Sequence, residues 1–184
     1  STEDILNAAD KINADTIYVL PNNSNIILAS NQAASIIEDK KLIVIPTKTI
    51  PQGITAMINF ELTRSADENE KAMLESLSTV KSGQLTYAVR DTSIDGKEIK
   101  KDNYLGLGDN GLASVGTDMD DTLIDMLSEF VDDESELISV YYGEDIDENK
   151  AEELVYKIEE KFDGVDVELQ YGGQPVYYYI VSVE

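Results

Sequence analysis

The chain has 184 residues, with 37 acidic and 14 basic side chains, no histidine and no cysteine, and its formal net charge is −23. This balance excludes the basic surface that nucleic-acid binding requires and disfavours adsorption to anionic membranes. Without histidine and cysteine there is no Ser–His–Asp or Cys–His nucleophile system, no imidazole or thiolate zinc site and no disulfide, which fits a reducing, cytoplasmic location.

The first part of the chain alternates helical and strand patterns. Apolar residues at helical spacing behind Ser1 predict a helix near residues 3–13, and "TIYVL" (16–20) is typical of a short buried strand. A helical stripe over 26–37, a second buried strand "LIVI" (42–45), a helix after Pro51 and a helix over 68–80 follow. The continuous apolar character of both strands is typical of a parallel sheet that is covered on both faces. We therefore expect an N-terminal β-α-β-α lobe with parallel strands over residues 1–81.

From Ser82 onward the pattern changes to that of a mixed sheet. "QLTYAVRD" (84–91) alternates like a half-buried strand, and turn signals stand at Asp95-Gly96 and Asn110-Gly111 between further short strands. A helix over 118–131, a strand over 136–143, a helix over 147–162 and two strands in "DVELQYGG" and "PVYYYIVSV" close the chain. These patterns predict a two-lobed α/β protein whose second, mixed α/β lobe covers residues 82–184.

Both early strands end in a proline that is followed by uncharged polar residues. Proline stops a strand, and Asn, Ser and Thr can cap the helix that comes next. If the two strands are adjacent and parallel, both helix N-termini point to one crevice, which would suit an anion. The alternative is that these residues are only caps and turns. The candidate binding residues are Asn22, Asn23, Ser24, Asn25, Thr47, Lys48, Thr49 and Gln52.

A second group of candidates lies in the second lobe. "GGQPVYYY" (172–179) is either a hairpin turn before a tyrosine-rich strand or a recognition loop, with Gly173, Gln174 and Tyr177 as its candidates. Tyr87 is a candidate interface anchor, and Arg90 either pairs with the adjacent Asp91 or binds a partner carboxylate.

We assign no catalytic residue and no metal site. "GLGDNG" (106–111) is better explained as a hairpin turn than as a dinucleotide site, because no helix pattern follows it. "TDMDD" (117–121) and "EDIDEN" (144–149) are interpreted as acidic helix starts, with weak adventitious Ca²⁺ or Mg²⁺ binding left open.

Four segments together resemble a known family: "YVLPNNSNIILA", "VIPTKTIPQGITA", "SGQLTYAVRDTSIDG" and "GGQPVYYYIVSVE". In this order and spacing they resemble the C-terminal region of FakA, the dihydroxyacetone-kinase-like component of bacterial fatty acid kinase. The resemblance implies a DegV-related fold and a role in engaging a separate fatty-acid-binding subunit. It also implies that ATP and Mg²⁺ bind to a helical domain outside this chain, where the fatty acid is phosphorylated to acyl phosphate, and that the parent protein is able to form a homodimer. By position, the family motifs fall on Pro21–Asn25, Pro46–Gly53, Ser82–Thr92 and Gly172–Tyr179.

Three functions stay open at this point. The first is a partner-docking region without a cofactor of its own, the second is a phosphate or carboxylate site with Lys48, and the third is a structural or dimerisation module that uses residues 176–183. The chain starts at Ser1 and reaches a helix almost at once, so we expect it to be a piece of a longer protein. No apolar run approaches the roughly 18 residues that span a bilayer, so no membrane insertion is expected.

Overall fold

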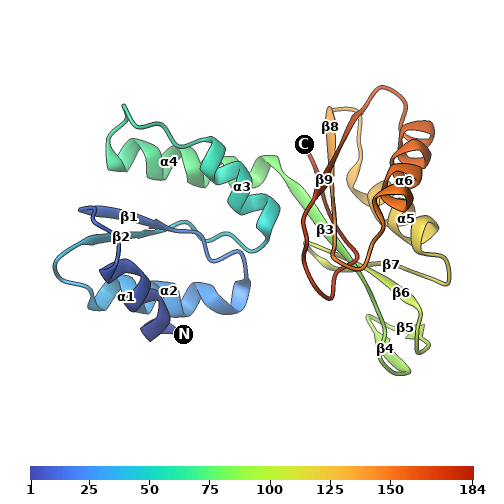
Figure 1. The fold of residues 1–184 in the computed structure, drawn as a ribbon, viewed down its shortest axis with the longest axis horizontal. Helices are drawn as coiled ribbons and strands as arrows, with labels where there is room; N and C mark the ends of the chain where they lie inside the picture. Colours follow the sequence, from blue (N-terminus) through green and yellow to red (C-terminus); the bar gives the residue numbers. More distant parts are fainter. The chain divides into compact units, whose positions relative to one another are not determined.

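The computed structural model describes residues 1–184, which divide into two compact units, Ser1–Val80 and Lys81–Glu184 (Figure 1). Both units combine helices with a sheet, so the α/β fold class predicted from the sequence is confirmed. Lys81 is the first residue of strand β3 and belongs to the second unit, whereas the sequence pattern places it at the end of the first lobe.

The first unit is built around two parallel strands. Its elements are α1 (Thr2–Asp10), β1 (Thr16–Val19), α2 (Ser24–Ile36), β2 (Lys41–Val44), α3 (Ile50–Ile58), α4 (Ala66–Ser76) and a short 3₁₀ helix, η1 (Leu77–Thr79). The strands pair in parallel, with Thr16 opposite Lys41 and Val19 opposite Val44. The expected side-by-side, same-direction arrangement of these strands is therefore confirmed.

Helices cover both faces of this small sheet. Figure 1 shows α1 and α2 on one side of β1 and β2, and α3 and α4 on the other. The first pair packs in a core that contains Ala9, Ile17, Ala33 and Leu42, and the second in a core that contains Ile43, Ile45, Ala56 and Met73. Since neighbouring residues of β2 enter different cores, the strand has no polar face, which explains the continuous apolar run in its sequence.

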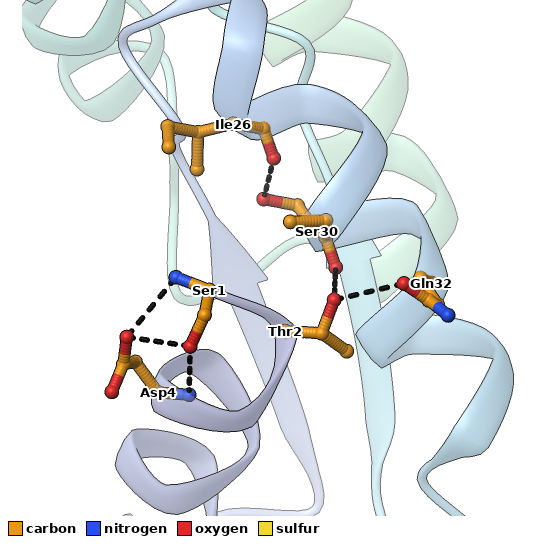
Figure 2. Close-up of polar contacts among 7 residues, drawn as sticks. Ser1, Thr2, Asp4, Ile26, Ser30 and Gln32 are labelled. Carbon is orange, nitrogen blue, oxygen red and sulfur yellow. Dashed lines mark hydrogen bonds and ion pairs between the residues drawn. The ribbon is translucent and has the colours of Figure 1, made fainter.

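Polar contacts fix the start of α1 and join it to α2 (Figure 2). Ser1 forms a capping box with Asp4, in which the Asp4 backbone N–H donates to Ser1 Oγ at 3.2 Å. The Thr2 hydroxyl donates to Gln32 Oε1 at 3.0 Å on α2. The caps satisfy N–H groups that the helix itself leaves unpaired.

The larger apolar residues in α3 and just after it are exposed. Met57 and Ile58 are 64% and 76% exposed, and Leu62, beyond the end of the helix, is 92% exposed, while the buried positions of α3 are Pro51, Gly53, Thr55 and Ala56. Small residues let the helix approach the strands closely, so the larger aliphatic side chains point away. In α4, Met73 is buried, whereas the next residue, Leu74, is 39% exposed.

The second unit contains a six-stranded sheet and a separate hairpin. Its elements are β3 (Lys81–Tyr87), β4 (Thr92–Ile94), β5 (Lys97–Ile99), β6 (Tyr104–Gly108), β7 (Gly111–Gly116), α5 (Met119–Phe130), β8 (Leu137–Tyr142), α6 (Glu148–Lys161), β9 (Asp166–Tyr171) and β10 (Tyr179–Val183). The sheet order is β7-β6-β3-β10-β8-β9, and only β8 and β9 pair in parallel. The mixed sheet expected for this part is therefore present.

Helices α5 and α6 lie on the same side of the six-stranded sheet (Figure 1). Their inward residues Leu123, Leu127, Leu154 and Ile158 are fully buried with strand residues such as Leu85 in the largest core of the chain. No helix of the structure combines the length and the apolar composition needed to cross a bilayer.

The expected hairpin before the tyrosine-rich strand is wrong. β9 pairs only with β8, and β10 lies between β3 and β8. All five residues of β10 are buried, so this strand is stabilised at the centre of the sheet rather than at an edge beside β9. The strand also begins only at Tyr179, which leaves residues 172–178 as an irregular connection.

Candidate functional site

The two proline-ended strands bring their following loops together, as the sequence predicts. We call residues 22–25 and 47–52 the rim. Because β1 and β2 are parallel, their carboxyl ends meet at the same edge. The Asn22 backbone N–H donates to Thr47 Oγ1 at 2.9 Å, and Thr47 is fully buried. This hydrogen bond joins one loop of the rim to the other.

Most polar residues of the rim have a capping partner. Asn23 is the N-cap of α2, and its Oδ1 accepts from the Asn25 backbone N–H at 2.9 Å just after Ser24, the first helical residue. Thr49 is the N-cap of α3, and its Oγ1 accepts from the Gln52 backbone N–H at 3.3 Å. These bonds agree with the interpretation of the rim as caps and turns.

Gln52, in the first turn of α3, contacts the loop residue Lys48, which precedes the N-cap Thr49. The Gln52 side-chain oxygen accepts from the Lys48 backbone N–H at 2.7 Å, so Gln52 holds the loop that carries Lys48. The Lys48 residue is exposed. Its ammonium group therefore remains in water, beside the start of α3.

Asn22 has no capping role in the rim. Its φ of 53° lies in the left-handed region, and its side chain lies so close to Gly53 that a Cβ there would stand 2.1 Å from Asn22 Oδ1. This oxygen is buried and has no hydrogen-bond partner. A buried acceptor without a partner costs free energy, so Asn22 lowers the stability of the rim.

In the second unit, the connection 172–178 is anchored to the end of β8. Gly173 has a φ of 66°, and its backbone N–H donates to the Tyr142 carbonyl at 3.2 Å. The Gln174 side chain donates to the Tyr141 carbonyl at 3.0 Å. Tyr177 is partly buried, and its N–H closes a tight turn on the Pro175 carbonyl at 2.7 Å. Gln174 thus holds the loop in place through its own amide.

Arg90 differs from the sequence-based expectation. β3 ends at Tyr87, so Arg90 lies in the exposed bend that follows and not on a strand. Asp91 does not pair with it but accepts from the Lys101 backbone N–H at 2.7 Å. The guanidinium is therefore available to solvent, without the internal ion pair that was one of its two interpretations.

Tyr87 belongs to a group of three aromatic rings. Its ring centroid lies 5.9 Å from that of Tyr178, and Tyr178 meets Tyr104 edge-on at 6.0 Å. Tyr87 is 41% exposed. Burial, together with the neighbouring hydroxyls of Tyr104 and Tyr87, raises the pKa of Tyr178, so the phenol stays protonated at neutral pH.

Two of these rings border a pocket of about 360 Å³ that sequence reasoning missed, and we call it the tyrosine–acid pocket. It is lined by Tyr104, Thr117, Asp118, Met119, Asp120, Asp145, Ile146, Lys150, Glu153, Tyr178 and Tyr179. The only sequence signal was the pair of acidic stretches 117–121 and 144–149. Their interpretation as helix starts agrees with the structure, in which Asp118 caps α5 and Asp147 caps α6. The structure adds that both stretches border one cavity.

Comparison with known sequences places the chain in a family. The model that describes the C-terminal part of proteins like FakA, a component of fatty acid kinase, matches residues 1–184. Protein YloV of Bacillus subtilis (strain 168) is 45% identical over 184 residues, which are 100% of this chain and 33% of that protein. An uncharacterized protein of Staphylococcus aureus (strain MRSA252) is also 45% identical, with the same coverage. The chain thus spans about a third of the length of the curated relatives it matches.

Comparison with solved structures identifies the fold. A DegV family protein from Corynebacterium glutamicum superposes on 100% of this chain and 82% of its own, with a TM-score of 0.70 and 11% identity. The Streptococcus pneumoniae fatty acid kinase B3 protein loaded with linoleic acid covers 100% of this chain and 76% of its own, with a TM-score of 0.69 and 13% identity. The DegV-like α/β fold that the resemblance implied is therefore confirmed. With its whole length matched by the family model, the chain belongs to the FakA-like C-terminal family of fatty acid kinase components.

Proposed function

We propose that this chain is the region through which a fatty acid kinase docks its separate fatty-acid-binding subunit. The observation that carries the proposal is the match of all 184 residues to the C-terminal model of a fatty acid kinase component. The curated relatives are about three times as long, so each has ample chain for a catalytic part elsewhere. In this proposal ATP and Mg²⁺ bind to that part, which phosphorylates the carried fatty acid to acyl phosphate.

The surface of the second unit has the residue types that protein interfaces use. Tyr87 and Arg90 are exposed near each other in the chain, and Tyr and Arg are the commonest anchors of interfaces. An interface below about 1,200 Å² suffices for a transient complex in which a carrier must bind and leave. Such a surface supports docking without requiring any catalytic group in this chain.

Isothermal titration calorimetry tests the docking function directly. The chain, verified as folded by circular dichroism, is titrated with the DegV-type fatty-acid-binding protein of the same organism. We expect a saturable heat with the cognate protein and none with an unrelated acidic protein of similar size. The absence of heat at several temperatures would refute docking, because a real interface changes heat capacity and cannot have zero enthalpy throughout.

A second candidate function is favoured by the position of Lys48 at the rim. The two helix starts meet there and the Lys48 ammonium is exposed beside one of them, an arrangement that suits a small carboxylate or phosphate. Chemical-shift mapping with phosphate, ATP and a short-chain fatty acid tests it. Shifts confined to residues 22–25 and 47–52 support the site, and unchanged amides of Thr47, Lys48 and Thr49 would eliminate it.

Dimerisation through residues 176–183 has less support than either function. β10 occupies a central position with β3 on one side and β8 on the other, so both of its hydrogen-bonding edges are already paired. A second copy of the chain could not add a strand to it.

A further inference from the structure

The lining of the tyrosine–acid pocket includes a hydroxyl group without a hydrogen-bond partner. Tyr179 is only 1% exposed, yet it lines the pocket. Its hydroxyl has no hydrogen-bond partner within the chain, and it is not among the polar atoms that are sealed from solvent. A buried tyrosine normally pairs its hydroxyl. The pocket therefore presents a donor and acceptor that the chain itself does not use.

The charges around this hydroxyl are mostly negative. Four carboxylates line the pocket, from Asp118, Asp120, Asp145 and Glu153, against one ammonium from Lys150. Only Asp120 has a cationic partner, Lys157 at 2.7 Å. One carboxylate oxygen of Asp118 accepts a hydrogen bond from the Asp121 backbone N–H, because Asp118 is the N-cap of α5. Asp145 and Glu153 form no ion pair within the chain.

The arrangement fits an organic cation better than a metal ion. The carboxylates do not converge closely enough to form a metal-binding group. Tyr104 and Tyr178 add aromatic surface to the same cavity, with their rings at 67° to each other. Aromatic faces attract cations, and a planar guanidinium can stack on a ring while its five N–H groups donate to carboxylate and hydroxyl oxygens.

We propose that the tyrosine–acid pocket is the receptor for an arginine side chain presented by the partner protein. The proposal rests on the docking function and names the chemistry of that partner: a basic surface with one projecting arginine. Asp145 and Glu153 accept the guanidinium N–H groups, the Tyr179 hydroxyl accepts one more, and the tyrosine rings cover the plane. Lysine fits less well, because a compact ammonium cannot reach acceptors on several walls at once.

Charge complementarity selects a protein partner as the occupant. With a net charge of −23, the chain attracts a basic surface over long range before contact, and the pocket then fixes the register. Tyr87 lies outside the pocket but contacts the ring of Tyr178 and is 41% exposed, so the aromatic surface extends beyond the volume that one side chain fills. A free small cation would use the pocket and leave Tyr87 uncovered.

The first test examines the pocket without the partner. The full chain is titrated with N-acetyl-arginine amide while the tyrosine ring resonances are followed, and the neutral isostere N-acetyl-citrulline amide is the control. We expect Tyr104, Tyr178 and Tyr179 to shift with the arginine compound only. We also expect a Glu153→Gln, Asp145→Asn double variant to lose the response. Equal responses to both compounds, or none in the unmodified chain, would overturn the proposal.

The second test connects the pocket to docking. Affinity for the cognate fatty-acid-binding protein is measured for Glu153→Gln, for Tyr179→Phe and for the matched control Glu152→Gln, which changes the neighbouring exposed residue of α6 outside the pocket. We expect the first two to weaken binding about three- to tenfold and the control to leave it within about twofold. If the pocket variants bind as well as the control does, docking stands and the arginine receptor is refuted. If the unmodified chain binds no carrier, both the docking function and the partner assignment fail, and the first test then reports only on a guanidinium pocket.

Discussion

Replacing Asn22 with glycine should stabilise the first unit, although it deletes a polar side chain from the candidate rim. The change removes a buried oxygen that has no partner, which is worth about 1–3 kcal/mol. It also relieves an L-residue at a φ of 53°, a conformation that asparagine tolerates better than most residues, so this gain is small. Against this stands the larger freedom of glycine in the unfolded chain, about 0.5–1 kcal/mol. The backbone bond to Thr47 Oγ1 is unaffected. The net expectation is a gain of about 1 kcal/mol.

Amide hydrogen exchange in β1 and β2 measures this gain in the unit that contains the change. About 1 kcal/mol corresponds to roughly fivefold slower exchange of the strand amides. Asn23→Gly is the matched control. It removes the N-cap side chain of α2 at the adjacent position and should lower stability by about a few tenths of a kcal/mol. Faster exchange in Asn22→Gly than in the unmodified chain would show that the oxygen has a partner in solution and would refute the reasoning. Loss of ligand-induced shifts together with the gain in stability would support the rim as a binding site.

Three further predictions test other parts of the structure. Gly53→Ala should lower stability by about 1–3 kcal/mol in the unmodified chain, because the new Cβ would meet Asn22 Oδ1 at 2.1 Å. In the Asn22→Gly background the same change should be nearly neutral. Additive effects of the two changes in urea unfolding would show that the two residues do not touch. Burial, and to a smaller extent Asp120, raises the pKa of Tyr179 above its ordinary 10.0, so the folded chain binds more protons than the unfolded one and stability falls as the pH rises above about 10. Tyr179→Phe should make that fall shallower, and identical slopes of unfolding free energy between about pH 9 and 11 would contradict this. Leu62→Gln, at a position 92% exposed, should change stability by less than about 0.5 kcal/mol. Leu85→Ala in the fully buried core should lower stability by about 2–5 kcal/mol. A large loss of stability for Leu62→Gln in thermal unfolding would mean that the Leu62 side chain is covered.

Local chemistry was enough to predict most elements and several caps. Helix-lined cores cover both faces of β1 and β2, so the apolar runs of these strands appear directly in the sequence, and their shared edge follows from parallel pairing. Asn23 lies in the predicted capping segment and Asp118 in a predicted acidic helix start, because a cap bonds to N–H groups only two or three residues away. Where the physical cause lies within a few residues, the pattern and the structure agree.

The position of β10 could not be predicted in the same way. The run "YIVSV" identifies a strand, but whether it pairs with β9 or enters between β3 and β8 depends on residues almost a hundred positions away in the chain. The orientation of α3 is a second example. Its apolar residues recur at helical spacing, yet the close approach of Gly53 and Ala56 to the core decides which side is buried. The orphaned oxygen of Asn22 likewise exists only because Gly53 leaves room for it.

The acidic starts of α5 and α6 contain more carboxylates than helix capping requires. One carboxylate is sufficient to cap each helix, and Asp118 and Asp147 fill these roles for α5 and α6. Asp145 precedes the N-cap of α6, and Glu153 lies in the second turn of this helix. Neither side chain therefore satisfies a free N–H group at the helix start. Like charges around one cavity repel each other, and capping gains nothing from them. Asp145 and Glu153 have no cationic partner among the ion pairs of the chain, and a bound guanidinium would supply one. This surplus is the feature of the pocket that folding alone does not explain.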